Sequence, residues 1–382
     1  MQKRIVQAVA VLLACIWFVP CVQVQELTVE APAAILMEAA TGTVIYEKQA
    51  HEKLAPASVT KVMTLLLVME ALESGRVGWD DTVVASETAA AKGGSQIYLE
   101  QGEQMGMEDM IKSVVVSSAN DCATALAEHI AGSEQAFVAM MNKRAAELGM
   151  ENTHFVNCTG LDDEPGSAEH LTTAYDIALM SRELLKHEDI RKYTTIWTDT
   201  VRGGEFGLSN TNKLVRFFEG TTGLKTGYTS AAGHCLSASA MRDGVEYIAV
   251  VLHCSSSASR FQSAKTLLSH GFANYTLARP DPTVEIPGVE VTLGKTDTIT
   301  PVVSDDAPVL IEKSRVNGVS TKVEVQPQVK APVEAGQKLG TVTLTADGQV
   351  LTQIPLVAPE TVPEKTWWDI TVELLQRVCF CP

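Results

Sequence analysis

The sequence predicts an α+β protein in which helices pack on an antiparallel sheet, followed by a small all-β domain and a C-terminal amphipathic helix. Three observations indicate this fold class. Strand patterns come first, then a long helical block, then strands and one more helix, which is the order expected when helices cover an antiparallel sheet. After Pro280-Asp281-Pro282 the composition shifts to Val, Thr, Pro and Gly in short alternating runs. The last residues gather Trp, Ile and Leu on one side of a helix.

The strands of the first region are predicted from alternation and turn residues. Residues 33–48 predict a hairpin, because two apolar runs flank Thr41-Gly42, a usable turn pair. Residues 196–256 carry a second set of strand patterns, with a tight turn at Asp243-Gly244. Beyond residue 283, alternating runs follow one another, and the last pair folds about Asp347-Gly348. This part holds no histidine, cysteine or acid–base cluster, so we expect it to be a spacer or binding module.

The helices are predicted from a 3.6-residue spacing of apolar side chains. The segments with this spacing are 58–75, 107–131, 134–149, 172–187 and 257–275. The first is almost uninterrupted in its apolar run and ends near Gly75. Together the patterns divide the chain into four parts: a signal peptide (1–26), a first domain (27–279), a small β-sandwich domain (283–358) and an amphipathic helix (366–380).

The N-terminus predicts export. Lys3 and Arg4 precede an apolar run that only Gln7 interrupts, and polar residues follow at 23–26. The run is too short for a confident membrane span, and a buried core helix is the alternative. The cleavage point is left open between a site near 21–26 and a loose lipoprotein-type box at Cys15. We therefore expect an extracytoplasmic protein.

The C-terminal helix predicts attachment to a membrane surface. Its broad apolar face carries Trp367, Trp368, Ile370, Leu374, Leu375 and Val378. Paired tryptophans suit the headgroup region, so the helix fits an interfacial anchor on the outer face of the cytoplasmic membrane. The polar face is not basic, and attachment would depend on apolar burial. The alternative is a helix that docks on the β domain of its own chain.

Composition excludes other function classes. The chain has 382 residues, is 46% hydrophobic and carries a net charge of −16, which argues against nucleic acid as a partner. Its eight cysteines form no CxxC pair, and there is no HExxH helix, so neither a metal nor a cofactor is expected. Cys235 and Cys254 fall on segments that fit neighbouring strands, which leaves a disulfide between them open.

Ser58 and Lys61 stand at the start of the first predicted helix. Pro56 disfavours a helix before it, and Lys61 is one turn after Ser58, so the two side chains share a face. The helix start offers backbone N–H groups to an oxyanion, and the apolar run would bury the amine and favour its neutral, basic form. A serine needs such a base to become a nucleophile. Taken alone, this spacing favours a serine N-cap with a solvated lysine.

Two further motifs in chain order strengthen the catalytic interpretation. The segment VVVSSAND (114–121) places Ser118 and Asn120 two residues apart at a helix start. The segment TTGLKTGYT (221–229) leads Lys225-Thr226-Gly227 into a strand. Separately, these are helix caps and a turn glycine with an exposed lysine. Their joint occurrence before a β-run favours a catalytic site.

This set of motifs resembles the penicillin-recognising serine enzymes. The chain is more closely similar to the low-molecular-mass D-alanyl-D-alanine carboxypeptidases, serine peptidase family S11, over roughly residues 30–275. PASVTK, GSQIYLEQGE, SSAND, LGMENTHF and GLKTGYTSAAG carry the resemblance. It implies a β-lactamase/transpeptidase-like domain with the site between its helical subdomain and its sheet. It also implies a penicillin-binding enzyme that removes the terminal D-alanine from peptidoglycan stem pentapeptides.

The resemblance also implies roles for individual residues. Ser58 would be the acylated nucleophile, Lys61 its base, and Ser118 a proton relay to the leaving amine. Asn120 would hold a substrate amide, while Lys225 and Thr226 would hold the terminal carboxylate. Gly227 would let the strand approach the substrate closely, and the N–H groups of Ser58 and Tyr228 would form the oxyanion hole.

Three positions depart from the better-known pattern of the family. Tyr228 stands where some members carry histidine, and Arg260 matches a family arginine only loosely. Cys158-Thr159-Gly160 interrupts a commoner His-Gly-Leu sequence in a loop that would line the cleft.

Three other functions are weighed as rivals. A class A β-lactamase would carry a Glu-x-x-Leu-Asn loop, which residues 121–220 lack, so β-lactams are expected to acylate Ser58 and leave slowly as covalent inhibitors. A wall-binding or penicillin-sensing protein without activity would be expected to have lost Ser58 or Lys61. A purely structural secreted domain would not explain three motifs in one domain.

Overall fold

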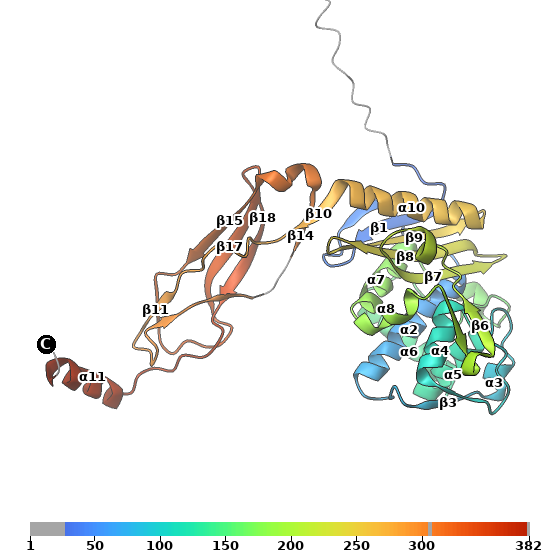
Figure 1. Ribbon diagram of the computed structural model, residues 1–382, viewed down its shortest axis with the longest axis horizontal. Helices are drawn as coiled ribbons and strands as arrows, with labels where there is room; N and C mark the ends of the chain where they lie inside the picture. Colours follow the sequence, from blue (N-terminus) through green and yellow to red (C-terminus); the bar gives the residue numbers. More distant parts are fainter. Residues whose placement is uncertain (1–26, 305–307, 380–382) are drawn as a thin grey trace, which may run out of the picture.

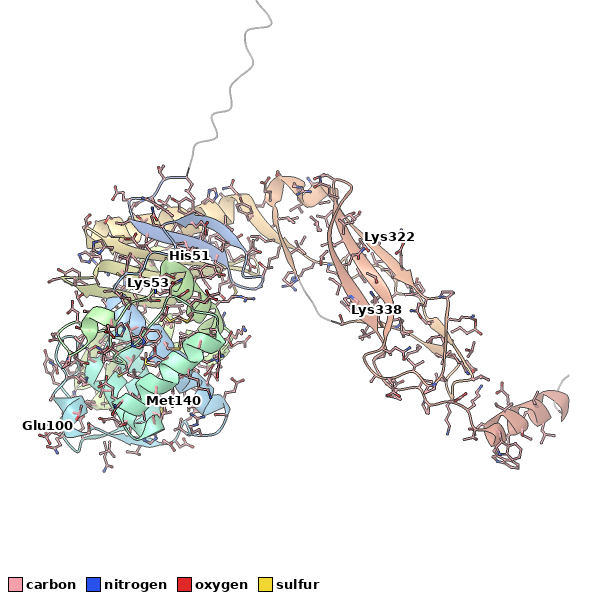
Figure 2. The ribbon with its side chains drawn as sticks, turned by 180° about the vertical axis from the view of Figure 1, so that it is seen from behind. His51, Lys53, Glu100, Met140, Lys322 and Lys338 are labelled. Carbon is pink, nitrogen blue, oxygen red and sulfur yellow. The ribbon has the colours of Figure 1, made fainter. Side chains whose placement is uncertain are left out.

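The computed structural model describes residues 27–304 and 308–379. Figure 1 shows a rounded first domain, an elongated β domain and helix α11 at the far end of the molecule. Figure 2 shows the same arrangement from behind, with Met140 in the helical layer and Lys322 on the β domain. The predicted signal peptide and the last residue of the predicted C-terminal helix lie outside the described residues. The predicted domain boundaries stay predictions.

A five-stranded antiparallel sheet forms the centre of the first domain, in the order β2-β1-β9-β8-β7. Its strands are β1 (Ala33–Glu38), β2 (Val44–Lys48), β7 (Thr221–Thr229), β8 (Gly233–Arg242) and β9 (Val245–Cys254). The predicted hairpins at 33–48 and around Asp243-Gly244 are confirmed. Cys235 and Cys254 lie on adjacent strands, but both thiols are free, so the disulfide left open by the sequence is not formed.

Both faces of this sheet are covered, which explains the nearly continuous apolar strands. On β9, Ile248, Val250 and Leu252 face the helical layer. Tyr247, Ala249 and Val251 alternate with them and pack in the second core, beneath helix α10 (Ser257–Asn274). The α+β fold class is therefore confirmed, with a helical layer on one side of an antiparallel sheet (Figure 1).

The helical layer surrounds helix α2 (Lys61–Glu73), which is buried along nearly its whole length. An apolar surface on all sides is the pattern of a central helix, and each buried leucine contributes about 1.5–3 kcal/mol. The other long helices of the layer are α4 (Met107–Val116), α5 (Asn120–Ala131), α6 (Glu134–Glu147) and α7 (Ala174–Leu185). Of these, α5, α6 and α7 pack against α2. The smaller elements are β3 (Thr82–Val84), α3 (Glu87–Ala90), β4 (Gln104–Gly106), η3 (Ser167–Glu169), η4 (Glu188–Ile190), α8 (Arg191–Thr194), β5 (Thr198–Val201), η5 (Arg202–Gly204), β6 (Phe206–Ser209) and α9 (Leu214–Phe217).

Two helix predictions need correction. The periodic segment 107–131 is two helices, because Ser118 adopts a φ of +63°, which no α-helical residue can have. The helix predicted from residue 58 begins as the 3₁₀ turn η2 (Ala57–Thr60), and its α-helical part starts at Lys61. Both deviations fall on candidate site residues.

The second domain is built from short strands, as predicted. One sheet has the order β12-β11-β16, a second β13-β18-β17-β15, and β10 pairs with β14. The bounds are β10 (Tyr275–Ala278), β11 (Val289–Thr292), β12 (Thr298–Ile299), β13 (Val302–Val303), β14 (Val309–Glu312), η6 (Lys313–Gly318), β15 (Val319–Val325), β16 (Gln328–Lys330), β17 (Lys338–Ala346) and β18 (Gln349–Val357). The turn at Asp347-Gly348 joins β17 to β18. Strand β10 precedes Pro280 yet pairs with β14, so strand pairing crosses the predicted boundary.

Helix α11 (Trp367–Cys379) is amphipathic, and among its apolar side chains Trp367, Trp368, Val372, Leu374 and Leu375 are exposed. Trp367 and Trp368 are 74% and 61% exposed, while Lys365 forms an ion pair with Glu373 at 2.9 Å. None of the helices in the described part of the chain combines the length and the apolar character needed to span a bilayer.

Candidate active site

Ser58 lies in η2, the 3₁₀ turn that directly precedes α2. Pro56 and Ala57 are buried, whereas Ser58 is partly exposed. Ala57 has a φ of +48°, a conformation rare for a residue with a side chain, and this turns the chain sharply before the serine. The Nζ of Lys61 donates a hydrogen bond to the Oγ of Ser58 at 3.0 Å. The two residues therefore share one turn, as the sequence predicts.

Lys61 is fully buried, which rules out the solvated lysine that the spacing alone would allow. Its Nζ also donates to the Oδ1 of Asn120 at 2.5 Å and to the carbonyl oxygen of Thr159 at 2.8 Å. Burial lowers the pKa of Lys61 to about 7, against the opposing influence of Cys158 and Asp121. On losing one proton, the amine can keep its bonds to Asn120 and Thr159 and present its lone pair to Ser58.

Ser118 and Asn120 occupy the bend between α4 and α5. Ser118 is 4% exposed at the residue with positive φ. The side-chain amide of Asn120 donates to the carbonyl oxygen of Gly93 at 2.7 Å, and its backbone N–H donates to that of Ser95 at 2.7 Å. Asn120 thus joins Lys61 to the segment after α3. This contact to Lys61 is one that the predicted substrate-binding role of Asn120 did not include.

Strand β7 brings Lys225, Thr226 and Gly227 against η2. A methyl group on Gly227 would lie 2.7 Å from the carbonyl oxygen of Pro56 and 3.0 Å from the nitrogen of Ser58. Only glycine permits this approach of the strand to the serine. The hydroxyl of Thr226 donates to that of Thr211 at 2.7 Å. Gly227 therefore lies against the turn that carries the nucleophile, and Thr226 and Lys225 directly precede it on the same strand.

Lys225 is buried beside two other cations. It is 1% exposed, and its Nζ donates to the carbonyl oxygen of Thr226 at 3.1 Å. Burial, followed by the positive charges of Lys61 and Arg260, holds the pKa of Lys225 well below its usual range. The guanidinium of Arg260 donates to the carbonyl oxygens of Gly227 and Cys235, so it ties β7 to β8 from below. The site is electropositive and suits an anionic ligand.

Tyr228 follows this motif and is 59% exposed. Its ring stacks on that of His234, its cross-strand neighbour, with centroids 4.3 Å apart. The side chain therefore forms an exposed aromatic surface at the end of the strand. The predicted role of Tyr228 concerns its backbone N–H alone.

Sequence reasoning missed how closely Gly160 meets the nucleophile turn. A methyl group on Gly160 would lie 1.9 Å from the carbonyl oxygen of Ala57, and the residue has a φ of +83°. The only signal was the unusual segment at 157–164, in which a glycine follows Cys158 and Thr159.

His170 and Asp121 were also not assigned a role. The N–H of Val156 donates to Nδ1 of His170, so Nε2 carries the proton and donates to the hydroxyl of Thr60. Burial lowers the pKa of His170 to about 4, which keeps the ring neutral. Asp121 accepts the N–H groups of Ile97 and Leu99 and fixes the segment before Glu100 on α5. Single residues of this kind have no pattern in the sequence, because their partners are far along the chain.

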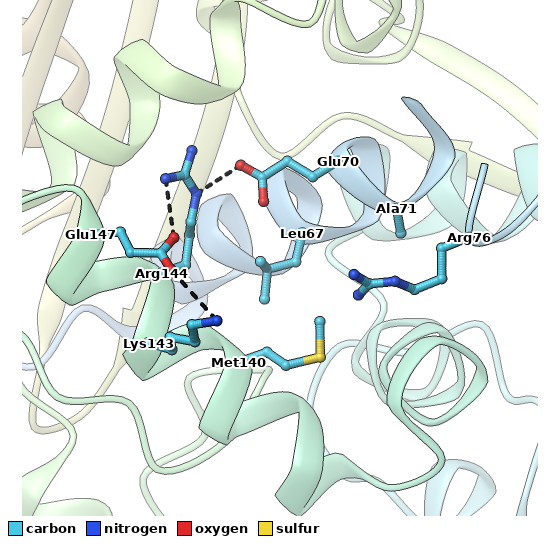
Figure 3. Close-up of a pocket in the computed structure, with 8 residues that line it drawn as sticks. All are labelled: Leu67, Glu70, Ala71, Arg76, Met140, Lys143, Arg144 and Glu147. Carbon is cyan, nitrogen blue, oxygen red and sulfur yellow. Dashed lines mark hydrogen bonds and ion pairs between the residues drawn. The ribbon is translucent and has the colours of Figure 1, made fainter. Parts of the chain in front are cut away.

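A hollow of about 350 Å³ between α2 and α6 is not part of this site. Figure 3 shows Arg144 of α6 reaching Glu70 of α2 across the hollow. Glu147, its second partner, lies on α6 itself. Glu70 lies nine residues after Lys61 on α2, which is about 14 Å along the helix. In residues 27–304 and 308–379, no three His, Cys, Asp or Glu side chains are grouped so that they could hold a metal ion.

Comparison with known families decides the assignment. Residues 21–256 match the D-alanyl-D-alanine carboxypeptidase family, peptidase S11, and residues 272–364 match the C-terminal domain of penicillin-binding protein 5. The chain belongs to the S11 carboxypeptidases. These are serine hydrolases, so the resemblance carried by the three motifs is confirmed, together with the expected fold and enzyme class.

Individual relatives agree with this assignment. D-alanyl-D-alanine carboxypeptidase DacF of Bacillus subtilis is 43% identical over 342 residues, which cover 88% of this chain and 86% of the relative. The crystal structure of penicillin-binding protein 5 from Haemophilus influenzae has a TM-score of 0.75 and 29% identity, covering 88% of this chain and 98% of that one. Ampicillin-bound penicillin-binding protein D2 of Listeria monocytogenes has a TM-score of 0.59 and 30% identity, covering 64% of this chain and 99% of its own.

Proposed function

We propose that this S11 carboxypeptidase removes the terminal D-alanine from peptidoglycan stem pentapeptides through an acyl-enzyme on Ser58. The observation that carries the proposal is the 3.0 Å contact between the Ser58 hydroxyl and a fully buried lysine amine. With a pKa lowered to about 7, Lys61 is present in large part as the neutral amine at neutral pH, and a neutral amine can accept the serine proton.

The reaction follows from this pair in two stages. The Oγ of Ser58 attacks the carbonyl carbon of the penultimate D-alanine while its proton passes to Lys61. The N–H groups of Ser58 and Tyr228 would hold the oxyanion, and Ser118 would pass a proton to the amine of the departing D-alanine. Water then attacks the ester carbonyl, the Ser58 oxygen leaves with a proton, and the shortened peptide is released.

The cations of the site support recognition of a terminal carboxylate. Lys225 is buried beside Lys61 and Arg260, and this surrounding disfavours its charged form. A substrate carboxylate bound by Lys225 and Thr226 would stabilise that charge, so a proton would be taken up on binding. A substrate whose last residue lacks a free carboxylate would lose this interaction.

The same geometry supports β-lactams as covalent inhibitors. The Listeria relative is described in ampicillin-bound form, and its match covers 64% of this chain. Residues 121–220 lack the Glu-x-x-Leu-Asn loop that would activate a deacylating water in a class A β-lactamase. Mass spectrometry of the penicillin-treated protein should show a stable adduct on Ser58, and rapid turnover of the drug would instead identify a β-lactamase.

Release of D-alanine from diacetyl-Lys-D-Ala-D-Ala tests the proposed activity. We expect release by the wild type, none by Ser58→Ala, and the wild-type rate from Ser320→Ala, a surface serine of β15 in the second domain. The proposal fails if Ser58→Ala releases D-alanine as fast as the wild type. Absence of release by a folded wild type that still binds penicillin would favour the non-enzymatic sensor.

We further propose that the protein is exported and that α11 holds it on the outer face of the cytoplasmic membrane. Its exposed tryptophans suit the interfacial region, and the helix lies at the far end of the molecule from the first domain (Figure 1). Flotation with neutral phosphatidylcholine vesicles tests the helix. Replacement of Trp367 and Trp368 by Ala should abolish flotation, whereas flotation that survives the double change would argue for a different mode of attachment.

A further inference from the structure

We propose that Lys92, Glu134 and Glu164 form a charged clamp that positions the acceptors of Lys61, and that Lys92 is therefore a positioning residue for acylation. The inference rests on the proposed function of Ser58 and Lys61. It concerns residues outside the three motifs, which join the segment after α3, the start of α6 and the loop after Gly160.

The clamp is compact and mostly removed from water. The Nζ of Lys92 lies 2.7 Å from an oxygen of Glu134 and 2.6 Å from one of Glu164. The side chain of Lys92 is 10% exposed, that of Glu134 16% and that of Glu164 24%. Burial alone would favour the neutral amine, but the hydrogen bonds that Lys92 donates to Glu134 and Glu164 raise its pKa above the usual value. The lysine is thus a permanent cation between two carboxylates.

One arm of the clamp leads to the Thr159 carbonyl. The other oxygen of Glu134, Oε1, accepts both the backbone N–H of Cys158 at 3.2 Å and its thiol at 3.1 Å. The carbonyl oxygen of Cys158 accepts the hydroxyl of Thr64 on α2 at 2.6 Å. The next residue, Thr159, presents its carbonyl oxygen to Lys61. Glu134 therefore fixes the residue that directly precedes an acceptor of the catalytic amine.

The other arm leads to Asn120. Lys92 directly precedes Gly93, whose carbonyl oxygen accepts the side-chain amide of Asn120 at 2.7 Å. The opposite end of that amide, Oδ1, accepts the Nζ of Lys61. The two acceptors of Lys61 other than Ser58 are thus both connected to the clamp. Thr159 follows Cys158, which Glu134 binds, and the side chain of Asn120 binds the residue after Lys92. A shift of either would turn the lone pair of the amine away from Ser58, and small displacements of this kind reduce rates strongly.

Removal of the clamp cation should also change the charge balance around Lys61. That amine is faced by Asp121 from α5, Cys158 from the loop and Lys225 from β7. Replacement of Lys92 leaves Glu134, which contacts Cys158, without its counter-charge. An added negative potential favours protonated Lys61, which is the inactive form.

The test measures the pH dependence of Ser58 acylation by a fluorescent penicillin, together with D-alanine release, in the full-length protein. For Lys92→Met we expect about a tenfold fall in the acylation rate constant at pH 7, with KM for the peptide nearly unchanged. The acidic limb of the profile should move upward by about half a pH unit. Lys92→Arg keeps the charge and should restore most of the rate.

Lys112→Met is the matched control. Lys112 also bridges two carboxylates, Asp109 at 3.0 Å and Asp199 at 3.3 Å, and its side chain is 16% exposed. It contacts neither the loop at 157–164 nor Asn120 through these bonds. We expect Lys112→Met to match Lys92→Met in its loss of thermal stability but to keep the wild-type rate and pH profile.

The outcomes separate the clamp from the proposed function. A Lys92→Met profile that superimposes on the wild type, or a Lys92→Arg variant as slow as Lys92→Met, would overturn the clamp. Equal pH shifts in Lys92→Met and Lys112→Met would overturn it too, since the effect would then be a general consequence of lost stability. If Ser58→Ala is acylated and active like the wild type, the proposed function fails whatever Lys92 does.

Discussion

The first domain buries two lysine side chains, whereas two lysines of the second domain are exposed. In the first domain Lys61 and Lys225 are 0% and 1% exposed, and each has its charged form disfavoured by burial. In the second domain Lys322 and Lys338 are exposed on the strands of the sheet, as Figure 2 shows. Burying an amine costs free energy unless polar partners compensate it. The first domain bears this cost at Lys61 and Lys225, which indicates that the chemistry takes place there.

The neighbours of the buried lysines support the same contrast. Lys61 is held by a serine, an asparagine and a backbone carbonyl, none of which carries a negative charge. Lys322 instead lies 2.6 Å from the exposed Glu324, a pair that adds little to stability. Neutral partners leave a lysine free to lose its proton, whereas a carboxylate partner keeps it charged. Uncharged hydrogen-bond partners, in addition to burial, therefore distinguish the lysine that can act as a base.

The largest expected effect comes from Lys61→Met. Methionine fills a similar volume without an amine, so Ser58 loses its base, and acylation by penicillin should fall by at least about a thousandfold. Relief of the burial cost offsets part of the lost hydrogen bonds, so the protein should remain folded. Stopped-flow acylation and circular dichroism check both points. Lys322→Met should keep the wild-type rate, and a fast Lys61→Met variant would remove the base from the mechanism.

The next prediction compares two glycines with similar surroundings. A methyl group on Gly227 would lie 2.7 Å from the carbonyl oxygen of Pro56, and one on Gly340 in β17 would lie 2.5 Å from that of Glu324. Gly227→Ala should slow acylation by about a hundredfold, because it pushes β7 away from the serine. Gly340→Ala should lower the melting temperature and leave the rate unchanged. Equal activity of the two variants would contradict the placement of β7.

The pH dependence sharpens the contrast between buried and exposed amines. Because the pKa of Lys61 is lowered to about 7, its neutral fraction falls as the pH drops below that value. The kcat/KM for D-alanine release should therefore decrease about tenfold per pH unit on the acidic side. A limb centred near 10, the value of an exposed lysine, would show that the amine is not buried in solution.

The smallest effect is expected from removing the β domain. A chain truncated after Ala278 keeps every candidate site residue. Release of D-alanine from a soluble peptide should stay within about twofold of the full-length rate. A loss of tenfold or more in a folded truncation would give the second domain a part in catalysis.

The sequence predicted those features that local patterns determine. Ser58 and Lys61 could be placed on one face because three residues of helix separate them, and Lys225 could be placed on a strand by its apolar neighbours. The helix start near Ser118 and Asn120 was predicted from the segment 114–121, but the positive φ of Ser118 was not, since no local pattern specifies it. The chain turns there only because tertiary contacts hold Asn120 to Gly93 and Ser95.

Other features depend on residues that are distant in sequence and could not be predicted. Gly160 meets Ala57, His170 meets Thr60, and Lys92 meets Glu164, each across many residues of chain. The pairing of β10 with β14 likewise crosses the domain boundary that was predicted at residues 280–282 from their prolines and from the change in composition after them. Patterns of composition report where a chain changes character, whereas strand pairing depends on which backbone groups meet in space.

Strand β7 is the last strand of its sheet, and its glycine is already pressed against the 3₁₀ turn that carries the serine. This contact occupies part of the open border of the sheet at the serine. The loose end of a small peptide can lie along the remaining border as an added strand, whereas a loop that a folded protein holds at both ends has less freedom to do so. Access to Ser58 would therefore depend on a free, extended terminus in the substrate.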